Sequence, residues 1–226
     1  MTAREELRQA IMADDEGRVA ELLRDDPSLA TADPSDALGS PVLTALYRAR
    51  HDSLPVLLGA NPRLTPEEAA ALGDVAVLGA HLEERPELAT AFADDGSTLL
   101  HRAAWFGRIE ACTLLLDRGA DVAAVSRDDA EQTPLHAAAQ RRHAEVCELL
   151  LSRGAPADAP QAEGFTALHL AAYLGDEDLA ILLLECGAHA TVESDDGKTP
   201  ADIAYLHEHD ILATMLEVVA GGGSAA

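Results

Sequence analysis

Lysine and aromatic residues are scarce in this chain of 226 residues, and positive charge is outnumbered. Lys198 is the only lysine, aromatic residues make up 3% of the sequence, and the formal net charge is −24. Proteins that bind a phosphate backbone or an anionic lipid surface need clustered Lys and Arg side chains. The composition therefore argues against binding to nucleic acid and against docking on a membrane. The remaining basic residues are all Arg, which together with the abundant Ala favours a GC-rich, bacterial source.

Long apolar runs and paired cysteines are also missing. No stretch approaches 18 uninterrupted apolar residues, and the first ten residues are charged, without the apolar core of a signal peptide. Cys112, Cys147 and Cys186 are odd in number and far apart, which favours reduced thiols over a disulfide framework. These features predict a cytoplasmic protein.

What the chain does contain is Ala and Leu, which account for most of its 48% hydrophobic residues. Runs of β-branched residues are missing, so the amino-acid composition favours helices that pack closely through small side chains. We therefore expect an all-α fold. The last six residues, 221–226, read Gly-Gly-Gly-Ser-Ala-Ala and are interpreted as a flexible tail or linker outside the fold.

One segment recurs along the second half of the chain. It begins at Thr98, Thr133, Thr166 and Thr199, and the separations are 35, 33 and 33 residues. The copy at Thr133 reads Thr-Pro-Leu-His-Ala-Ala. Thr suits the N-cap of a helix, and proline suits the first helical position because its missing N–H costs nothing there. Pro134 and Pro200 occupy that position in two copies, so a short helix is predicted to start after each threonine.

A second apolar segment follows in each of the first three copies and ends in Leu-Leu-Leu, two further residues and then Gly-Ala. Gly107 and Gly175 permit a tight turn between the two segments. A glycine after the second segment, at Gly119, Gly154 or Gly187, supplies the left-handed residue that ends a helix. The repeating unit is therefore predicted to be helix, turn, helix and loop.

Such a helix pair cannot bury its apolar faces alone, so copies must stack into a solenoid with one continuous core. The Thr-Pro-Leu-His, Ala-Ala, Leu-Leu and Gly-Ala elements at a period of about 33 residues resemble ankyrin repeats. Four clear copies fall at residues 92–124, 126–159, 160–192 and 194–219. The resemblance implies an ankyrin-repeat solenoid with short hairpin-like loops.

The first 90 residues show a similar periodicity of helix pairs, with weaker repeat motifs. Degenerate repeats are predicted at residues 3–32, 36–62 and 66–90, which makes seven repeats in a single domain over residues 1–220. Residues 61–67 leave little room for a hairpin, so a shortened connection is expected there. Residues 121–132 are two longer than the usual spacing and should carry an extended finger.

The recurring histidines could be taken for a metal ladder. The ankyrin resemblance instead implies a structural role for His101, His136 and His169, in which each bonds its own threonine and a neighbouring loop. Metal ligands must converge within about 2.1 Å of one ion, whereas stacked repeats lie about 8–10 Å apart. The cluster from His207 to Asp210 has its two histidines on different sides of a helix, so we expect no metal and no cofactor.

The cysteines follow the same repeat geometry. Cys112 and Cys147 take equivalent places in successive second helices and are predicted to be buried and too far apart to bridge. Cys186 is predicted to be partly exposed. No Gly-rich phosphate loop, nucleophile elbow or paired carboxylates in a pocket appears, so the chain is not expected to be an enzyme.

The ankyrin resemblance implies binding of another protein along a concave face of hairpin tips and first helices. Five of the seven aromatic residues map onto that face, beside acidic doublets at the hairpin tips. Aromatic anchors dominate many protein interfaces, although an aromatic after Ala-Ala can instead pack between neighbouring first helices. The candidate partner-binding residues are Phe92, Asp94, Asp95, Ser97, Trp105, Phe106, Gln132, Gln140, Arg141, Phe165, Tyr173, Leu174, Asp195, Asp196 and Lys198.

Two functions follow from these features. The first is a monomeric, non-enzymatic scaffold module whose acidic rim favours a basic protein partner. The second is an acidic mimic of nucleic acid that occupies a basic DNA-binding protein, with the −24 charge as its active feature. The first would depend on the aromatic residues, and the second would weaken steeply with salt.

Overall fold

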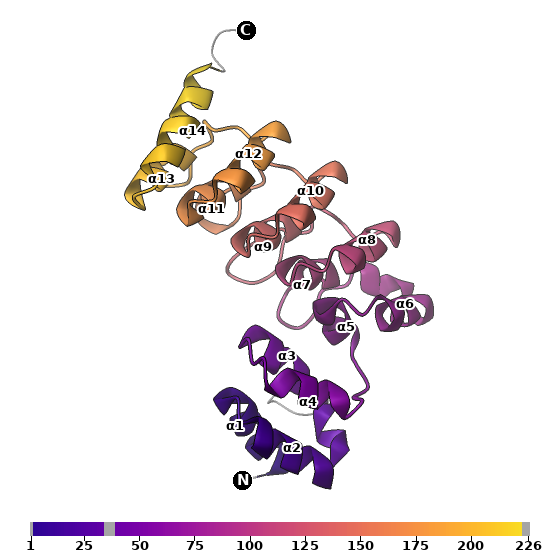
Figure 1. Cartoon of the computed structure of the whole chain (residues 1–226). Helices are drawn as coiled ribbons and strands as arrows, with labels where there is room; N and C mark the ends of the chain where they lie inside the picture. The colour runs from indigo at the N-terminus through magenta and orange to yellow at the C-terminus, as the bar shows by residue number, and fades with distance from the viewer. Residues whose placement is uncertain (1, 34–38, 223–226) are drawn as a thin grey trace. The chain divides into compact units, whose positions relative to one another are not determined.

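The computed structural model describes residues 2–33 and 39–222, and within them the chain forms helices joined by turns and loops (Figure 1). No strand forms in these two ranges beyond an isolated bridge between Phe92 and Thr98. The predicted all-α repeat fold is confirmed, with seven successive helix pairs along the described chain. The α-helices are α1 Ala3–Ala13, α2 Glu16–Asp25, α3 Pro41–Tyr47, α4 Ser53–Gly59, α5 Pro66–Leu72, α6 Val75–Glu84, α7 Leu99–Trp105, α8 Ile109–Asp117, α9 Pro134–Gln140, α10 Ala144–Ser152, α11 Ala167–Leu174, α12 Glu177–Glu185, α13 Pro200–Leu206 and α14 Asp210–Gly222.

The chain divides into two compact units, residues 1–71 and 72–226. The first unit holds α1 to α4 and nearly all of α5, and the second holds α6 to α14. A single domain over residues 1–220 therefore stays a prediction. The last helix extends through Gly222, two residues into the predicted tail, and residues 223–226 lie outside the described part of the chain.

In the first unit α1 packs on α2 and α3, and α4 packs on α2. Leu7, Ile11 and Leu57 are completely or almost completely buried between these helices. Asp14 adopts a left-handed conformation after α1, and its Oδ1 accepts hydrogen bonds from the backbone N–H and the hydroxyl of Ser53. These bonds join the first helix pair to the second and lower the pKa of Asp14.

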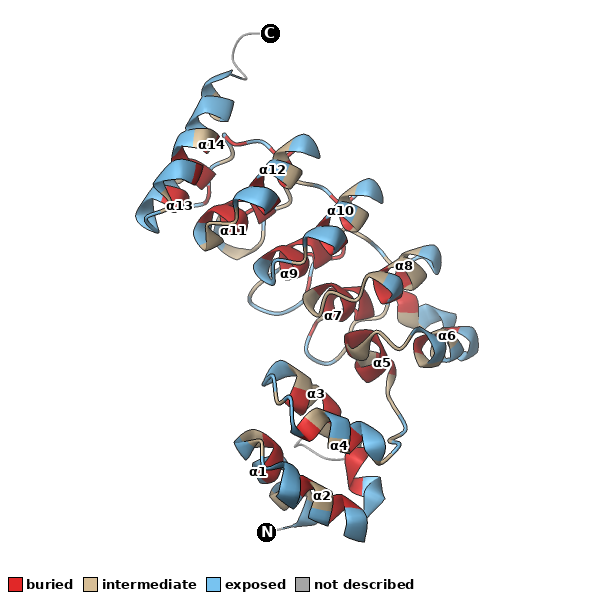
Figure 2. Cartoon of the chain, in the orientation of Figure 1, coloured by how far each residue is buried: buried red, intermediate tan, exposed pale blue. Residues whose placement is uncertain are grey.

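The second unit is built from two rows of helices. Figure 1 shows α7, α9, α11 and α13 side by side, and each packs against the next. The row of second helices, α6, α8, α10 and α12, packs in the same order. Figure 2 shows buried residues where the rows meet, and the alanine pairs of the first helices are fully buried there. Small side chains at these positions allow the close stacking that the repeats need.

Local sequence signals set the ends of these helices. The hydroxyl of Thr133 accepts a hydrogen bond from the N–H of His136, and Pro134 takes the first helical position of α9. Thr98, Thr166 and Thr199 cap α7, α11 and α13 in the same way. Gly119, Gly154 and Gly187 follow the second helices with φ of 87°, 90° and 96°. This left-handed conformation is open to glycine at little cost, and it ends each helix where the chain must turn.

The loops between repeats differ in length, as the spacing of the repeats in the sequence predicted. A backbone hydrogen bond closes each hairpin-like finger, from Ala93 to Ser97, from Gln161 to Phe165 and from Ser194 to Lys198. The finger after α8 closes from Ser126 to Gln132 and is therefore two residues longer. Only residues 60–65 connect α4 to α5, so that connection is short. None of the described helices is long and apolar enough to cross a membrane.

Candidate functional site

Four fingers stand beside the first helices of the second unit and are hydrogen-bonded to one another. The N–H of Arg127 donates to the carbonyl of Gly96 at 2.9 Å, and the N–H of Asp195 donates to the carbonyl of Glu163 at 3.0 Å. The finger after α8 is joined to the next one by a bond from Ala162 to Ala130 at 3.0 Å. A continuous backbone ladder therefore holds the finger tips in a fixed order.

The recurring histidines join each first helix to the next loop. Nδ1 of His136 lies 2.8 Å from the hydroxyl of Thr133 and accepts the Thr133 N–H at 3.2 Å. With Nδ1 as acceptor, Nε2 carries the proton and donates to the carbonyl of Phe165 at 3.2 Å. His101 and His169 make equivalent bonds to the carbonyls of Gln132 and Lys198. Burial lowers the pKa of all three histidines, to about 4 for His136.

The turns at the other end of the first helices also interlock. His143 lies on Gly107, and its Nε2 donates to the carbonyl of Trp105 at 3.1 Å. His209 takes the same place on Gly175 and lies 3.3 Å from the carbonyl of Tyr173. Arg142 replaces the glycine in the intervening turn, with a φ of 59°, and reaches forward to the carbonyl of Leu174.

Comparison with known proteins decides the family. Residues 95–127 match the ankyrin repeat, and residues 123–194 match a model of three consecutive ankyrin repeats. This chain is an ankyrin-repeat protein. It is also 37% identical over 54 residues to Rabankyrin-5 from Mus musculus, a match that covers 24% of this chain and 5% of that protein. The chain thus spans only a small fraction of that relative's length.

The candidate aromatic residues of the ankyrin groove lie on this framework, and four of them contact a ring or a cation. The guanidinium of Arg127 lies 3.8 Å above the ring of Phe92, and that of Arg141 lies 5.1 Å from the ring of Trp105. Phe165 contacts the ring of His169 within its own repeat. Each of the two Arg contacts joins the α7 repeat to the α9 repeat, because cation and ring come from different repeats.

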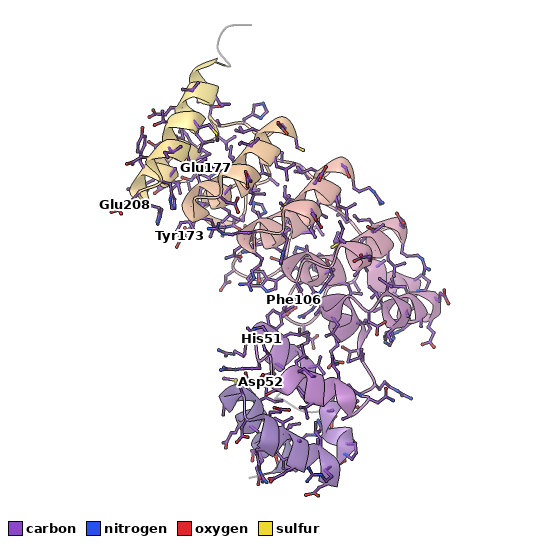
Figure 3. All side chains as sticks on the ribbon, viewed as in Figure 1. His51, Asp52, Phe106, Tyr173, Glu177 and Glu208 are labelled. Carbon is purple, nitrogen blue, oxygen red and sulfur yellow. The ribbon has the colours of Figure 1, made fainter. Side chains whose placement is uncertain are left out.

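Tyr173 is the most exposed of the candidate aromatics, at 50%. Its ring makes an edge contact with His207, with centroids 4.3 Å apart. Trp105 and Phe106 are partly buried at the end of α7. Figure 3 shows Phe106, Tyr173 and Glu208 in succession along one edge of the second unit. These residues contact neighbouring repeats and still present part of their surface to solvent.

The acidic doublets divide into two kinds of residue. Asp94 and Asp195 are exposed at the second position of their fingers. Asp95 instead accepts hydrogen bonds from the N–H and hydroxyl of Ser97, and its second oxygen pairs with Arg102 at 2.6 Å. Asp196 likewise bonds the hydroxyl of Ser194 within its own finger and pairs with Lys198. Asp95 and Asp196 therefore hold their own fingers in shape.

Two polar candidates, Gln140 and Arg141, are exposed at the end of α9 and just after it. The side-chain oxygen of Gln140 accepts a bond from Gln132 at 3.3 Å, which links the long finger to the helix. Leu174 is half-buried beside Tyr173.

Arg102 is a finger-stabilising residue that the motif did not reveal. It is only 7% exposed, and it occupies a helix position that holds Ala137, Leu170 and Ile203 in the other repeats. A charged residue at a position that is otherwise apolar was the available signal for the ion pair between buried Arg102 and the exposed finger residue Asp95.

The histidines after α13 turn towards Tyr173. His207 contacts its ring and Nε2 of His209 lies near its carbonyl, so the pair contributes to stacking of the last two repeats. Within residues 2–33 and 39–222, no three His, Cys, Asp or Glu side chains gather as metal ligands. Cys112 and Cys147 are buried, and burial raises their pKa to about 12, whereas Cys186 is exposed, as predicted.

Proposed function

We propose that this ankyrin protein binds another protein through the groove formed by its fingers and first helices in the second unit. Ankyrin repeats generally mediate protein–protein interaction, and repeats occupy this unit. The observation that carries the proposal is the gathering of aromatic residues on a face that backbone hydrogen bonds hold in place. Trp105, Phe106 and Tyr173 belong to the residue types that anchor interfaces, and all three keep surface available to a partner.

The fixed backbone around these anchors favours binding. The finger ladder and the histidine bonds order the groove before any partner arrives, so less conformational entropy is lost on association. Exposed Asp94, Asp129 and Asp195 at the finger tips would attract a basic surface on the partner and speed encounter at low salt. The groove has no arrangement of nucleophile and base that suggests catalysis, so we propose a non-enzymatic scaffold.

The setting of this function is part of the proposal. Three unpaired cysteines, two of them buried, suit a reducing compartment and therefore the cytoplasm. A strong negative charge disfavours association of two copies, so the protein would act as a monomer. The preference for Arg over Lys supports a bacterial source.

Removal of the aromatic anchors tests the groove. We expect the double variant Trp105→Ala, Tyr173→Ala to lose capture of the partner that the wild-type protein retrieves from its host's lysate. Tyr47→Ala is the matched control, because Tyr47 is 48% exposed but lies in the first unit. Unchanged capture by the double variant, with far-ultraviolet circular dichroism like that of the wild type, would show that the groove is not the binding site.

The net charge of −24 supports a second candidate, an electrostatic decoy for a basic DNA-binding protein. Such binding would weaken steeply between low and physiological salt and would survive loss of Trp105 and Tyr173. Capture at two salt concentrations with the same double variant separates the two functions.

A further inference from the structure

Basic side chains gather at one edge of the groove, on the side opposite the fingers. We call this the turn edge and define it as Trp105, Phe106, Arg108, Arg141, Arg142 and His143, which lie at the ends of α7 and α9 and in the turns that follow. Arg108 and Arg141 both lie close enough to His143 to help lower its pKa, after the larger effect of burial. The whole chain has only 16 Lys and Arg residues against 40 Asp and Glu residues, so three arginines at one edge are not expected from composition.

Arg141 is oriented for a carboxylate. Its guanidinium lies over Trp105, 5.1 Å from the centroid of the ring, its side chain is exposed, and no carboxylate of the described residues pairs with it. Stacking holds the plane of a guanidinium while leaving its N–H groups at the rim, where a carboxylate accepts two parallel hydrogen bonds. Trp105 and Phe106 supply an apolar surface directly beside this charge.

An open depression of 310 Å³ adjoins this pair and is lined by Gly107, Arg142, His143 and the first residues of α10. Arg142 is 51% exposed here; its Nη2 donates to the carbonyl of Leu174 and its Nη1 lies 3.6 Å from Asp176. A guanidinium has five N–H donors, so these two contacts do not use all of them. Glu145 is the one acidic residue in this lining. The depression therefore adds a second guanidinium to the surface that Arg141 and Trp105 begin.

Distance separates this edge from the acidic fingers. A first helix of seven residues, such as α9, places about 10 Å between its two ends. The Debye length at physiological ionic strength is about 8 Å, so salt largely screens the turn edge from the negative charge of the fingers. Cations at the C-terminal end of a helix also interact favourably with its dipole, so this arrangement is stable without a ligand.

We propose that the turn edge binds an acidic peptide segment of a protein partner. Carboxylates of the segment pair with Arg141 and Arg142, and an apolar side chain packs on Trp105 and Phe106. This inference rests on the proposed function and adds the chemistry and direction of the bound segment, whose acidic side faces the turns and whose basic side faces the fingers. A nucleic-acid strand fits less well, because its phosphates would also meet the acidic finger tips.

Fluorescence can follow this edge directly, because Trp105 is the only tryptophan. The probes are two synthetic amphipathic peptides of equal length and equal apolar content, with Glu along one edge in the first and Lys in the second. We expect the Glu peptide to shift Trp105 emission and saturate, and Arg141→Gln to weaken its binding roughly tenfold through loss of a charge-assisted pair. Arg153→Gln, the same charge change at the end of α10, should bind as the wild type does.

Each other outcome has a defined meaning. If only the Lys peptide saturates, or if Arg141→Gln binds the Glu peptide as tightly as the wild type, the acidic-segment inference is wrong while the groove function stands. If neither peptide shifts Trp105 and the aromatic double variant still captures the native partner, both proposals fail. If the protein alone shifts Trp105 emission with rising concentration and sediments as a dimer, the occupant is a second copy and the inference is overturned.

Discussion

His143 and Gly107 fit together so closely that no side chain can replace the glycine without movement. A Cβ built on Gly107 would lie 2.7 Å from Nδ1 of His143, and Gly107 has a φ of 68°. The same histidine donates to the carbonyl of Trp105, so one contact couples the stacking of two repeats to the position of the tryptophan.

Gly107→Ala is expected to destabilise the fold by roughly 2 kcal/mol, through backbone strain and displacement of His143. Gly119→Ala is the matched control, because Gly119 has a φ of 87° but nothing lies within 4 Å of its added Cβ. That variant should show the backbone cost alone, about 1 kcal/mol for an L-residue in the left-handed conformation. Urea unfolding measures both values, and equal losses would mean that the His143 contact contributes nothing to stability.

Acid should weaken the second unit through its buried histidines. The pKa of His136 falls from the ordinary 6.5 to about 4 in the folded state, so the unfolded chain takes up the proton first as pH falls. The stability from this residue is therefore complete above pH 6.5 and decreases down to about pH 4, by roughly 3 kcal/mol. Burial lowers the pKa of His101 and His169 in the same direction.

Urea midpoints at pH 7 and pH 4.5 test this pH dependence. His136→Gln keeps one donor and one acceptor without the titration, so its midpoint should change less between the two pH values. The exposed His51 gives a control in His51→Gln, which should keep the full wild-type dependence. If the urea midpoint of His136→Gln changed between the two pH values as much as that of the wild type, His136 would not be the source of the pH dependence.

The thiols should differ sharply in reactivity. Cys186 is exposed, whereas burial raises the pKa of Cys112 and Cys147 to about 12 and leaves almost no thiolate at neutral pH. A thiol reagent should therefore modify one cysteine quickly in the native protein and the other two only on unfolding. Peptide mapping after brief alkylation identifies the site, and early labelling of Cys147 would contradict the burial.

The finger ladder should break at Gly164. A Cβ there would lie 2.7 Å from the backbone nitrogen of Asp195, which donates to Glu163. Gly164→Ala should therefore speed hydrogen exchange of the Asp195 amide. Gly197→Ala is the control, since Gly197 has a φ of 74° but nothing within 4 Å, and it should leave that amide protected.

Repeat architecture was predictable because its signals are local. Thr133 and Pro134 begin a helix and Gly154 ends one through interactions that span four residues or fewer, so they can be read along the chain. The length of the long finger followed from counting between Thr98 and Thr133. The burial of Cys112 and Cys147 followed from their equivalent places in stacked helices.

The candidate groove was only partly predictable. Its aromatic residues could be placed on a face from the repeat register, but the contacts of Phe92, Trp105 and Tyr173 could not, because their partners come from the next repeat. Arg141 meets Trp105 and Arg127 meets Phe92 across more than 30 residues of sequence. The different roles of the two residues in each acidic doublet could not be predicted either, since Asp95 pairs with the buried Arg102.

The sequence by itself determined the helix pairs, their caps and the order in which they stack, because a repeated pattern imposes the same local geometry at each copy. Only the tertiary structure decided which of the varying side chains remain available. Their exposure depends on which residues the neighbouring repeat places beside them: His143 covers Gly107, Arg142 bonds the carbonyl of Leu174, and Arg141 stays exposed above Trp105. That dependence arises because stacking brings side chains into contact that the local pattern leaves unspecified.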